Sequence, residues 1–329
     1  MRKGKLLAFS TMFALSFMAA PAGAVLNDPP VIRPDTLRQI APGVSVVPDP
    51  RINYVPNIGI IEGRDAILVV DTGMGAANGK LLYEKAKEVA KGRRIYLTTT
   101  HFHPEHSFGA SAFPADSFIQ NKAQADELAR KGDDFVQLFR SFGTVERDAL
   151  KDVELGKAGI TYSGRKELDL GGRKVLLIEA PAHTAGDQLI FEPKSGVVFT
   201  GDLIEDRFFP IMPDKDTKGS GWIEVTEQIQ QLRPKIVVPG HGDLGGVSMV
   251  KATQAYLRHV RKSVFALVDK GWSQADITKH LAPKLRKIHS DWDNSVFIPY
   301  EIAVFYAERT GKPLELPQLS SDLQSDTRK

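Results

Sequence analysis

The chain has 329 residues, of which 42% are hydrophobic and 25% charged, ordinary values for a soluble globular protein with a substantial core. It contains no cysteine, so disulfides and thiolate ligands or nucleophiles are excluded, and any metal site must use His, Asp and Glu. The 43 Lys and Arg residues nearly balance 40 Asp and Glu, which gives no indication of a nucleic-acid or membrane-surface partner.

The N-terminal residues have the pattern of a secretory signal peptide. Three cations within residues 1–5 precede an apolar run over 6–20, and small residues follow at 22–24. A run of about 15 residues is shorter than the ~20 needed to span a bilayer, which argues against a membrane anchor. We expect residues 1–24 to be removed by cleavage after Ala24, leaving a periplasmic or secreted protein with 40 cations and 40 acids.

The predicted elements follow in two rounds of strands and helices. A proline-rich, extended lead-in covers residues 25–43. Apolar runs between turn residues predict strands over 44–47, 58–62, 66–71, 94–99, 167–170, 174–179, 189–192, 197–201 and 236–238. Helical spacing predicts helices over 80–91, 107–113, 123–150 with breaks near Gly132 and Gly143, 222–232, 249–270, 273–280 and 296–309, before a polar tail at 311–329.

The two rounds, residues 44–150 and 160–245, predict an α/β fold in which two sheets face each other with helices outside, an αβ/βα sandwich. No linker divides the chain after the lead-in. We therefore expect a single domain over 44–310, completed by C-terminal helices from about residue 247.

A cluster of metal-binding side chains follows the strand predicted at 94–99. His101, His103, Glu105 and His106 lie within six residues. Imidazole is the commonest biological metal ligand, and alternate residues of an extended segment point the same way, so His101 and His103 can reach one ion. The next two residues then face a second position.

Three further candidates stand directly after predicted strands. They are His183, Asp202 and His241, in the segments Ala180–Asp187, Thr200–Asp202 and Pro239–Gly242. Loops held by a rigid scaffold are where binding and catalytic groups concentrate. Five histidines and two carboxylates at strand ends together predict a metal centre.

These residues resemble the signature of the metallo-β-lactamase superfamily. Its first motif, H-x-H-x-D-H, corresponds to residues 101–106, and its strand-ending D-[TS]-G corresponds to Asp71–Gly73. His183, Asp202 and His241 match the later ligands in order, so the resemblance covers about residues 44–245. Within the superfamily, the chain looks closest to periplasmic zinc metallohydrolases associated with sulfur oxidation or quinoprotein pathways.

The resemblance implies a role for each residue and two zinc ions per chain. The first zinc would be held by His101, His103 and His183, the second by Glu105, His106 and His241, with Asp202 bridging both and Asp71 orienting a ligand histidine. Imidazole with carboxylate suits zinc but also iron or manganese. His103 favours zinc, because iron-using relatives carry Glu at that position.

Glu105 departs from the family pattern, which has Asp there. The longer side chain leaves three possibilities: normal ligation after a backbone shift, a weakened second site, or action as a base without ligation. We expect ligation.

The expected function is that of a secreted zinc hydrolase, in which a metal-bound hydroxide cleaves a small ester, thioester or lactam. The substrate, pathway and oligomeric state are not predicted, and substrate selection is expected from the loop 49–57, with Tyr54, and from the apolar segment 207–213, with Arg207 as a possible partner of a substrate anion. The alternatives are a non-catalytic metal-binding or partner-docking protein and a metal-dependent redox enzyme.

Overall fold

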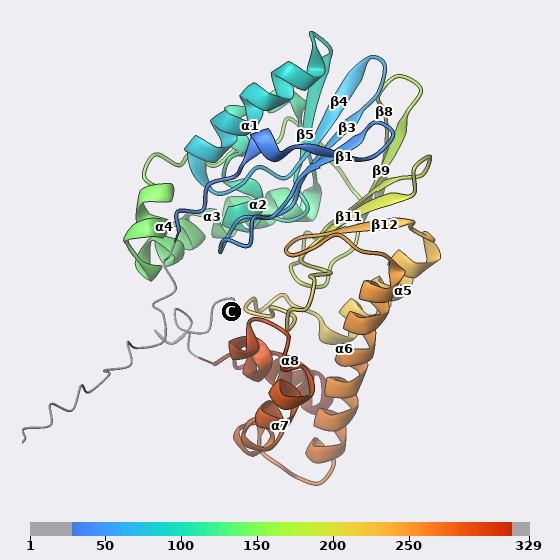
Figure 1. The fold of residues 1–329 in the computed structure, drawn as a ribbon. Coiled ribbons are helices and arrows are strands. Elements are labelled where there is room, and N and C mark those ends of the chain that lie inside the picture. Colours follow the sequence, from blue (N-terminus) through green and yellow to red (C-terminus); the bar gives the residue numbers. More distant parts are fainter. Residues whose placement is uncertain (1–27, 318–329) are drawn as a thin grey trace, which may run out of the picture.

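Two mixed sheets form the centre of the computed structural model, which describes residues 28–317 (Figure 1). The expected signal peptide and most of the polar tail lie outside the described residues. The first sheet runs in the order β1-β2-β3-β4-β5-β6-β7 and the second in the order β12-β11-β10-β9-β8. The first sheet contains β1 Arg38–Ala41, β2 Val44–Val47, β3 Ile58–Glu62, β4 Ala66–Val70, β5 Arg94–Thr98, β6 Phe118–Asn121 and β7 Ile160–Tyr162. The second contains β8 Arg165–Asp169, β9 Lys174–Glu179, β10 Gln188–Glu192, β11 Val197–Gly201 and β12 Ile236–Pro239.

The facing surfaces of the two sheets enclose one hydrophobic core. Leu68 and Val70 of the first sheet pack with Leu177, Ile190 and Phe199 of the second, all buried. Along the strands, apolar side chains either alternate with polar ones or occupy every position, as expected for strands buried on one or both faces. The sandwich predicted from the sequence is confirmed.

Helices cover the outer faces of both sheets (Figure 1). The first side carries α1 Gly75–Ala90, α2 Pro104–Ser107, α3 Lys122–Phe142 and α4 Thr144–Ala149. The second side carries α5 Gly219–Gln231 and α6 Val247–Val268. Helix α8 Ile298–Thr310 packs on α5 and α6, and α7 Gln274–Ile288 packs on α6 and α8, away from the strands (Figure 1). Short 3-10 helices stand at Pro34–Thr36, Ala110–Ala112, Ala115–Ser117 and Ser295–Phe297. Leu82 and Ala86 of α1 are buried against the first sheet, and Trp222, Val260 and Phe305 belong to the core behind the second.

Several element boundaries differ from those predicted. The expected break at Gly132 is wrong, since α3 is continuous from Lys122 to Phe142. The helix expected over 107–113 is replaced by α2 and a 3-10 turn at Ala110–Ala112. Strand β1 lies within the expected lead-in, β6 and β7 were not predicted, and α7 extends to Ile288. None of the helices in residues 28–317 is long and apolar enough to cross a membrane.

The fold brings the carboxyl ends of strands from both sheets to one edge. Gln188 N donates to Thr100 O at 2.9 Å, which links the loop after β5 to the start of β10. Gly240 N donates to Gly201 O at 2.9 Å, which ties the loops after β12 and β11 together. The candidate residues stand on these loops.

Candidate metal centre

The structure gathers all of the predicted ligands into two adjoining groups. Each residue offers one ligand atom, and within each group these atoms lie within 4.8 Å of one another. The groups are His101, His103, His183 and Asp202, and Glu105, His106, Asp202 and His241. Every one of these residues is at most 8% exposed. Glu105 is therefore placed with the second group despite its longer side chain.

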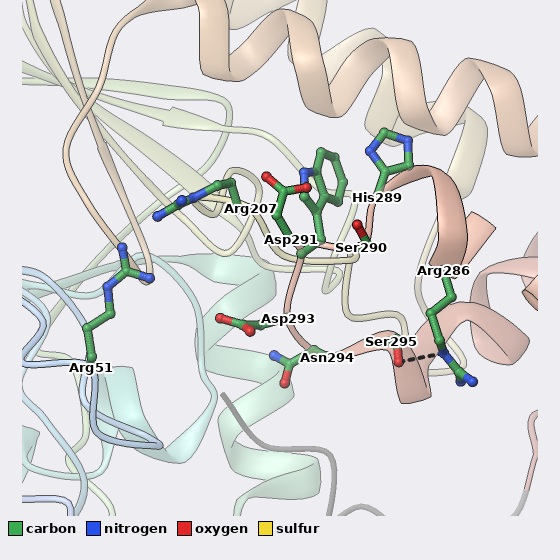
Figure 2. A pocket seen from close by; sticks show the side chains of 10 residues that line it. Arg51, Arg207, Arg286, His289, Ser290, Asp291, Asp293, Asn294 and Ser295 are labelled. Carbon is green, nitrogen blue, oxygen red and sulfur yellow. Dashed lines mark hydrogen bonds between the residues drawn. The ribbon is translucent and has the colours of Figure 1, made fainter. Parts of the chain in front are cut away.

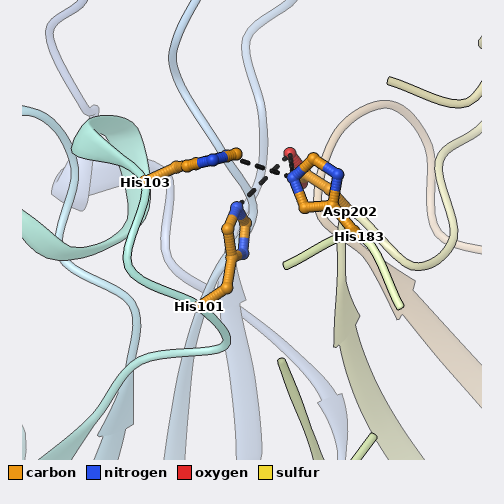
Figure 3. A group of neighbouring side chains, drawn as sticks. All are labelled: His101, His103, His183 and Asp202. Atoms are coloured by element: carbon orange, nitrogen blue, oxygen red, sulfur yellow. Dashed lines mark hydrogen bonds and ion pairs between the residues drawn. The ribbon is translucent and has the colours of Figure 1, made fainter. Parts of the chain in front are cut away.

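Asp202 belongs to both groups and turns one carboxylate oxygen towards each. Its Oδ2 lies 3.7 Å from His101 Nε2 and 3.9 Å from His183 Nε2 (Figure 3). Its Oδ1 lies 3.1 Å from His106 Nε2 and 3.8 Å from His241 Nε2. Two ligands about 2.1 Å from a tetrahedral zinc lie roughly 3.4 Å apart, so these separations suit ions placed on either side of the carboxylate.

The second ring nitrogen of several histidines is held by the protein. His106 Nδ1 lies 2.9 Å from Asp71 Oδ2, and His183 Nδ1 lies 2.7 Å from the carbonyl oxygen of Ile211. His241 Nδ1 lies 3.2 Å from the carbonyl oxygen of Val55. Such contacts fix the orientation of each ring, and each residue offers one ligand atom to its group.

Asp71 combines an uncommon backbone conformation with three contacts at the end of β4. Its φ is +67°, in the left-handed region that Asp tolerates better than most residues. Its Oδ1 accepts from Thr100 N at 2.6 Å, and its Oδ2 accepts from Thr100 Oγ1 at 3.0 Å. The carboxylate therefore holds His106 and the backbone just before His101 together.

Buried ligand atoms lack hydrogen-bond partners, which tests whether the residues fit a metal. His101 Nε2 and Glu105 Oε2 have no such partner, and His106 Nε2 and Asp202 Oδ1 have only ion-pair contacts, including the one of 3.1 Å with each other. A buried polar atom without a partner destabilises the fold by roughly 1–3 kcal/mol. These atoms belong to the two groups of candidate ligands, and cations bound there would satisfy them.

The charges of the centre shift the pKa values of its members. Burial, followed by the nearby His103, lowers the pKa of His183 to about 4, which keeps its ring neutral at pH 7. Against the effect of burial, His106 beside Asp202 and Asp71 has a pKa well above its usual value. Asp202 has a pKa well below its usual range, because the surrounding histidines His106, His241 and His101 outweigh burial.

The loop that carries His183 is organised by Asp187. The Asp187 carboxylate accepts from Ala182 N at 3.0 Å and from Thr184 N at 2.8 Å. Burial raises the pKa of Asp187 to about 7. The sequence pattern indicated a role for His183 in this segment and none for Asp187. The signal that could have found Asp187 is an acidic residue four positions after a candidate ligand and directly before the next strand.

In the two loops expected to select the substrate, several apolar side chains pack against the protein interior. Phe209 and Met212 are fully buried in the core behind the second sheet, so their expected place in a pocket is wrong. Phe208 lies against His241, with ring centroids 6.3 Å apart. Tyr54 packs on Phe139 of α3, with ring centroids 5.3 Å apart.

A cavity of about 240 Å³ adjoins this edge (Figure 2). Its wall is formed by Arg51, Arg207, Arg286 and residues 289–295. Arg51 forms ion pairs with Asp206 at 3.2 Å and Asp243 at 2.8 Å, and Arg207 also contacts Asp206 at 3.4 Å. The cavity contains none of the candidate ligands, although Asp206 N donates to His241 O at 3.1 Å.

A model of the metallo-beta-lactamase superfamily matches residues 52–241, more than half of the chain. The chain belongs to the metallo-beta-lactamase superfamily. Its fold and the metal-dependent hydrolase class expected from the sequence are thereby confirmed. The matched segment begins in the loop that contains Tyr54 and ends at His241.

A curated protein resembles the chain at low sequence identity. A linear primary-alkylsulfatase from Pseudomonas sp. (strain ATCC 19151) is 20% identical over 244 residues, which cover 64% of this chain and 45% of that protein. The chain thus matches less than half of the length of this relative.

Two solved structures share the fold. A metallo-beta-lactamase from Pontibacter korlensis superposes with a TM-score of 0.54 at 19% identity, covering 68% of this chain and 98% of that one. The sec-alkylsulfatase Pisa1 from Pseudomonas sp. superposes with a TM-score of 0.62 at 13% identity, covering 84% and 50%.

Proposed function

We propose that the protein is a dinuclear zinc hydrolase that cleaves a small ester-type substrate. The observation that carries this proposal is the position of Asp202, with one carboxylate oxygen facing each group of buried ligands. His101, His103 and His183 would hold one zinc, Glu105, His106 and His241 the other, and Asp202 would bridge them. Bound zinc supplies an activated water near neutral pH and polarises the oxygen of the bond to be cleaved.

The residues around the centre hold the ligands in place and bury them. Asp71 fixes His106 and the loop after β5, and Ile211 O fixes the ring of His183. The almost complete burial of the ligands lowers the local dielectric constant, which strengthens every interaction between the centre and a substrate's developing charge.

Three bond types fit this chemistry: esters, thioesters and lactams. Sulfate esters are the first esters to test, because two similar proteins, one matched in sequence and one in fold, are described as alkylsulfatases. Lactams are the next substrates to test, because the superposition with the matched metallo-beta-lactamase covers 98% of that protein. The ligands set the type of reaction, whereas the loops around them select the substrate.

The test is hydrolysis of a substrate panel by protein purified without chelators. The panel contains an alkyl sulfate, an aryl sulfate, an aryl acetate, a thioester and a chromogenic lactam. We expect hydrolysis that a chelator abolishes and that zinc restores, and we expect His106→Ala to lose it. A zinc-loaded protein that leaves the whole panel intact would contradict the proposal. Iron with a redox-active spectrum would instead support the alternative of a redox enzyme.

We further propose that the protein is exported, on the pattern of residues 1–24. The test is the intact mass and compartment of the protein expressed from its full sequence. A mature protein that begins at Val25 in the periplasm or medium is expected, and an unprocessed cytoplasmic chain would contradict this proposal.

A further inference from the structure

Asp214 lies on the segment between β11 and α5 and contacts a ligand of the metal centre. Its Oδ2 is 3.3 Å from Nε2 of His103, and the side chains involved are at most 10% exposed. The other ring nitrogen of His103, Nδ1, points at Nε2 of His183 across 3.1 Å (Figure 3). His103 therefore lies between a carboxylate and the position of the first ion.

The hydrogen bonds of the two rings determine which nitrogens carry protons. His183 Nδ1 donates to the carbonyl oxygen of Ile211, so its Nε2 presents a lone pair. When His103 donates from Nε2 to Asp214, its Nδ1 presents a lone pair as well. Two lone pairs that face each other at 3.1 Å repel, so the pair needs either a proton on His103 Nδ1, which makes the contact a hydrogen bond, or a metal cation that both nitrogens bind.

Lys131 of α3 holds the carboxylate of Asp214 in this place. Its Nζ lies 3.7 Å from Asp214 Oδ1 and 2.9 Å from Glu127 Oε1. It also lies 5.3 Å above the ring centroid of Phe102, the residue between two of the ligand histidines. The side chain of Lys131 is 19% exposed, so its charge is only partly screened by water.

We propose that Asp214 is a positioning residue that sets the ring orientation and tautomer of His103 for metal binding, and that Lys131 fixes Asp214 by joining α3 to the segment after β11. This inference rests on the metal centre of the proposed function. The inference goes beyond the proposed function, because it attributes part of the affinity for the first ion to a carboxylate that does not itself bind the metal.

Asp216 provides a matched control on the same loop. Its carboxylate lies 2.6 Å from the same Lys131 Nζ, from a side chain that is 40% exposed. Removing it weakens the connection between the loop and α3 while leaving the contact between Asp214 and His103. A comparison of the two aspartates therefore separates the orientation of His103 from a general stabilisation of the loop.

The experiment measures zinc affinity and metal geometry in the full-length protein. Stripped protein is titrated with zinc against a chromophoric chelator, and the absorption spectrum of the cobalt form reports the ligand geometry. For Asp214→Ala we expect one of the two zinc ions to bind about 10- to 100-fold more weakly, with a changed cobalt spectrum. Asp214→Asn, whose amide oxygen still accepts from His103, is expected to recover part of the affinity, and Asp216→Ala to stay within about threefold of the unaltered protein.

Each outcome decides the proposal. Equal affinity in Asp214→Ala and the unaltered protein overturns it, as does an equal loss in Asp214→Ala and Asp216→Ala. Asp214→Asn keeps the shape of the side chain and serves as the deciding variant if Asp214→Ala does not fold. Zinc binding without hydrolysis in the unaltered protein defeats the proposed function alone, whereas failure of the unaltered protein to bind any metal overturns both.

Discussion

Gly240 packs directly against Asp202. A Cβ atom at Gly240 would lie 2.0 Å from Asp202 Oδ1 and 2.8 Å from the carbonyl carbon of Gly201. Gly240 N also donates to Gly201 O at 2.9 Å and to Ile204 O at 3.1 Å. The absence of a side chain therefore lets the loop that carries His241 approach the carboxylate that both ligand groups share.

Gly240→Ala should consequently displace Asp202 or His241. We expect the zinc content, measured by mass spectrometry, to fall from about two ions per chain towards one or none, with hydrolysis reduced at least about 100-fold. Gly246→Ala is the matched control, since a Cβ there meets nothing within 4 Å and the φ of Gly246 is −129°. Normal zinc content in Gly240→Ala would show that the loop relaxes without loss of the centre.

The role of Glu105 can be read from zinc stoichiometry. Its carboxylate is 8% exposed, and its Oε2 lacks a hydrogen-bond partner. We expect the unaltered protein to bind about two zinc ions and Glu105→Ala to keep about one, because the first group does not include Glu105. Glu105→Asp, which restores the family's residue, should bind both. Two tightly bound ions in Glu105→Ala would mean that Glu105 is no ligand, and the remaining role to test would be that of a base.

Asp71 is expected to stabilise both the fold and the second ion. Asp71→Ala removes the carboxylate oxygens to which Thr100 N and His106 Nδ1 are hydrogen-bonded. Each buried donor that is left without a partner lowers the free energy of unfolding by roughly 1–3 kcal/mol. We expect a lower midpoint of urea unfolding and weaker binding of one zinc ion. Asp65→Ala is the control, since Asp65 lies on the exposed turn that precedes the same strand and bonds Arg64. Equal midpoints for the two variants would contradict this role of Asp71.

The sandwich and the clustering of the candidate site residues could be predicted because each depends on a local pattern. The strands that flank the core are short apolar runs between turn residues, and five histidines directly follow such runs or lie in the turn after one. Strands β6 and β7 escaped prediction because their sequences, Phe-Ile-Gln-Asn and Ile-Thr-Tyr, are short and partly polar and so form no apolar run. Nothing near them in the sequence indicates a partner.

Gly132 and Asp214 show what local patterns cannot give. Gly132 was expected to break a helix, yet it lies within α3, where a Cβ would come 2.4 Å from Leu155 Cδ1. The glycine is there for close packing, which depends on a segment more than twenty residues away. Asp214 stands in a loop without periodicity, so only the folded chain brings it to His103, which is 111 residues earlier.

Glu301 should make the stability of the protein depend on pH through the helices behind the second sheet. The residue is fully buried on α8, and Tyr256 of α6 donates a hydrogen bond to its Oε2. Burial raises the pKa of Glu301 well above its usual value, although the bond from Tyr256 lowers it in part. In the unfolded chain Glu ionises near pH ~4.3. The contribution of Glu301 is thus fully present below that pH and is lost progressively as the pH rises towards the folded pKa.

Glu301→Gln keeps an acceptor for Tyr256 and removes the titration. We expect its free energy of unfolding, relative to the unaltered protein, to rise by about 1.4 kcal/mol for each pH unit above ~5 until the folded pKa is reached. Urea unfolding at a series of pH values from 5 to 8 measures this difference, and groups elsewhere, including the metal ligands, cancel between the two proteins. Curves that stay parallel across the series would mean that Glu301 ionises in the folded state much as it does in the unfolded chain.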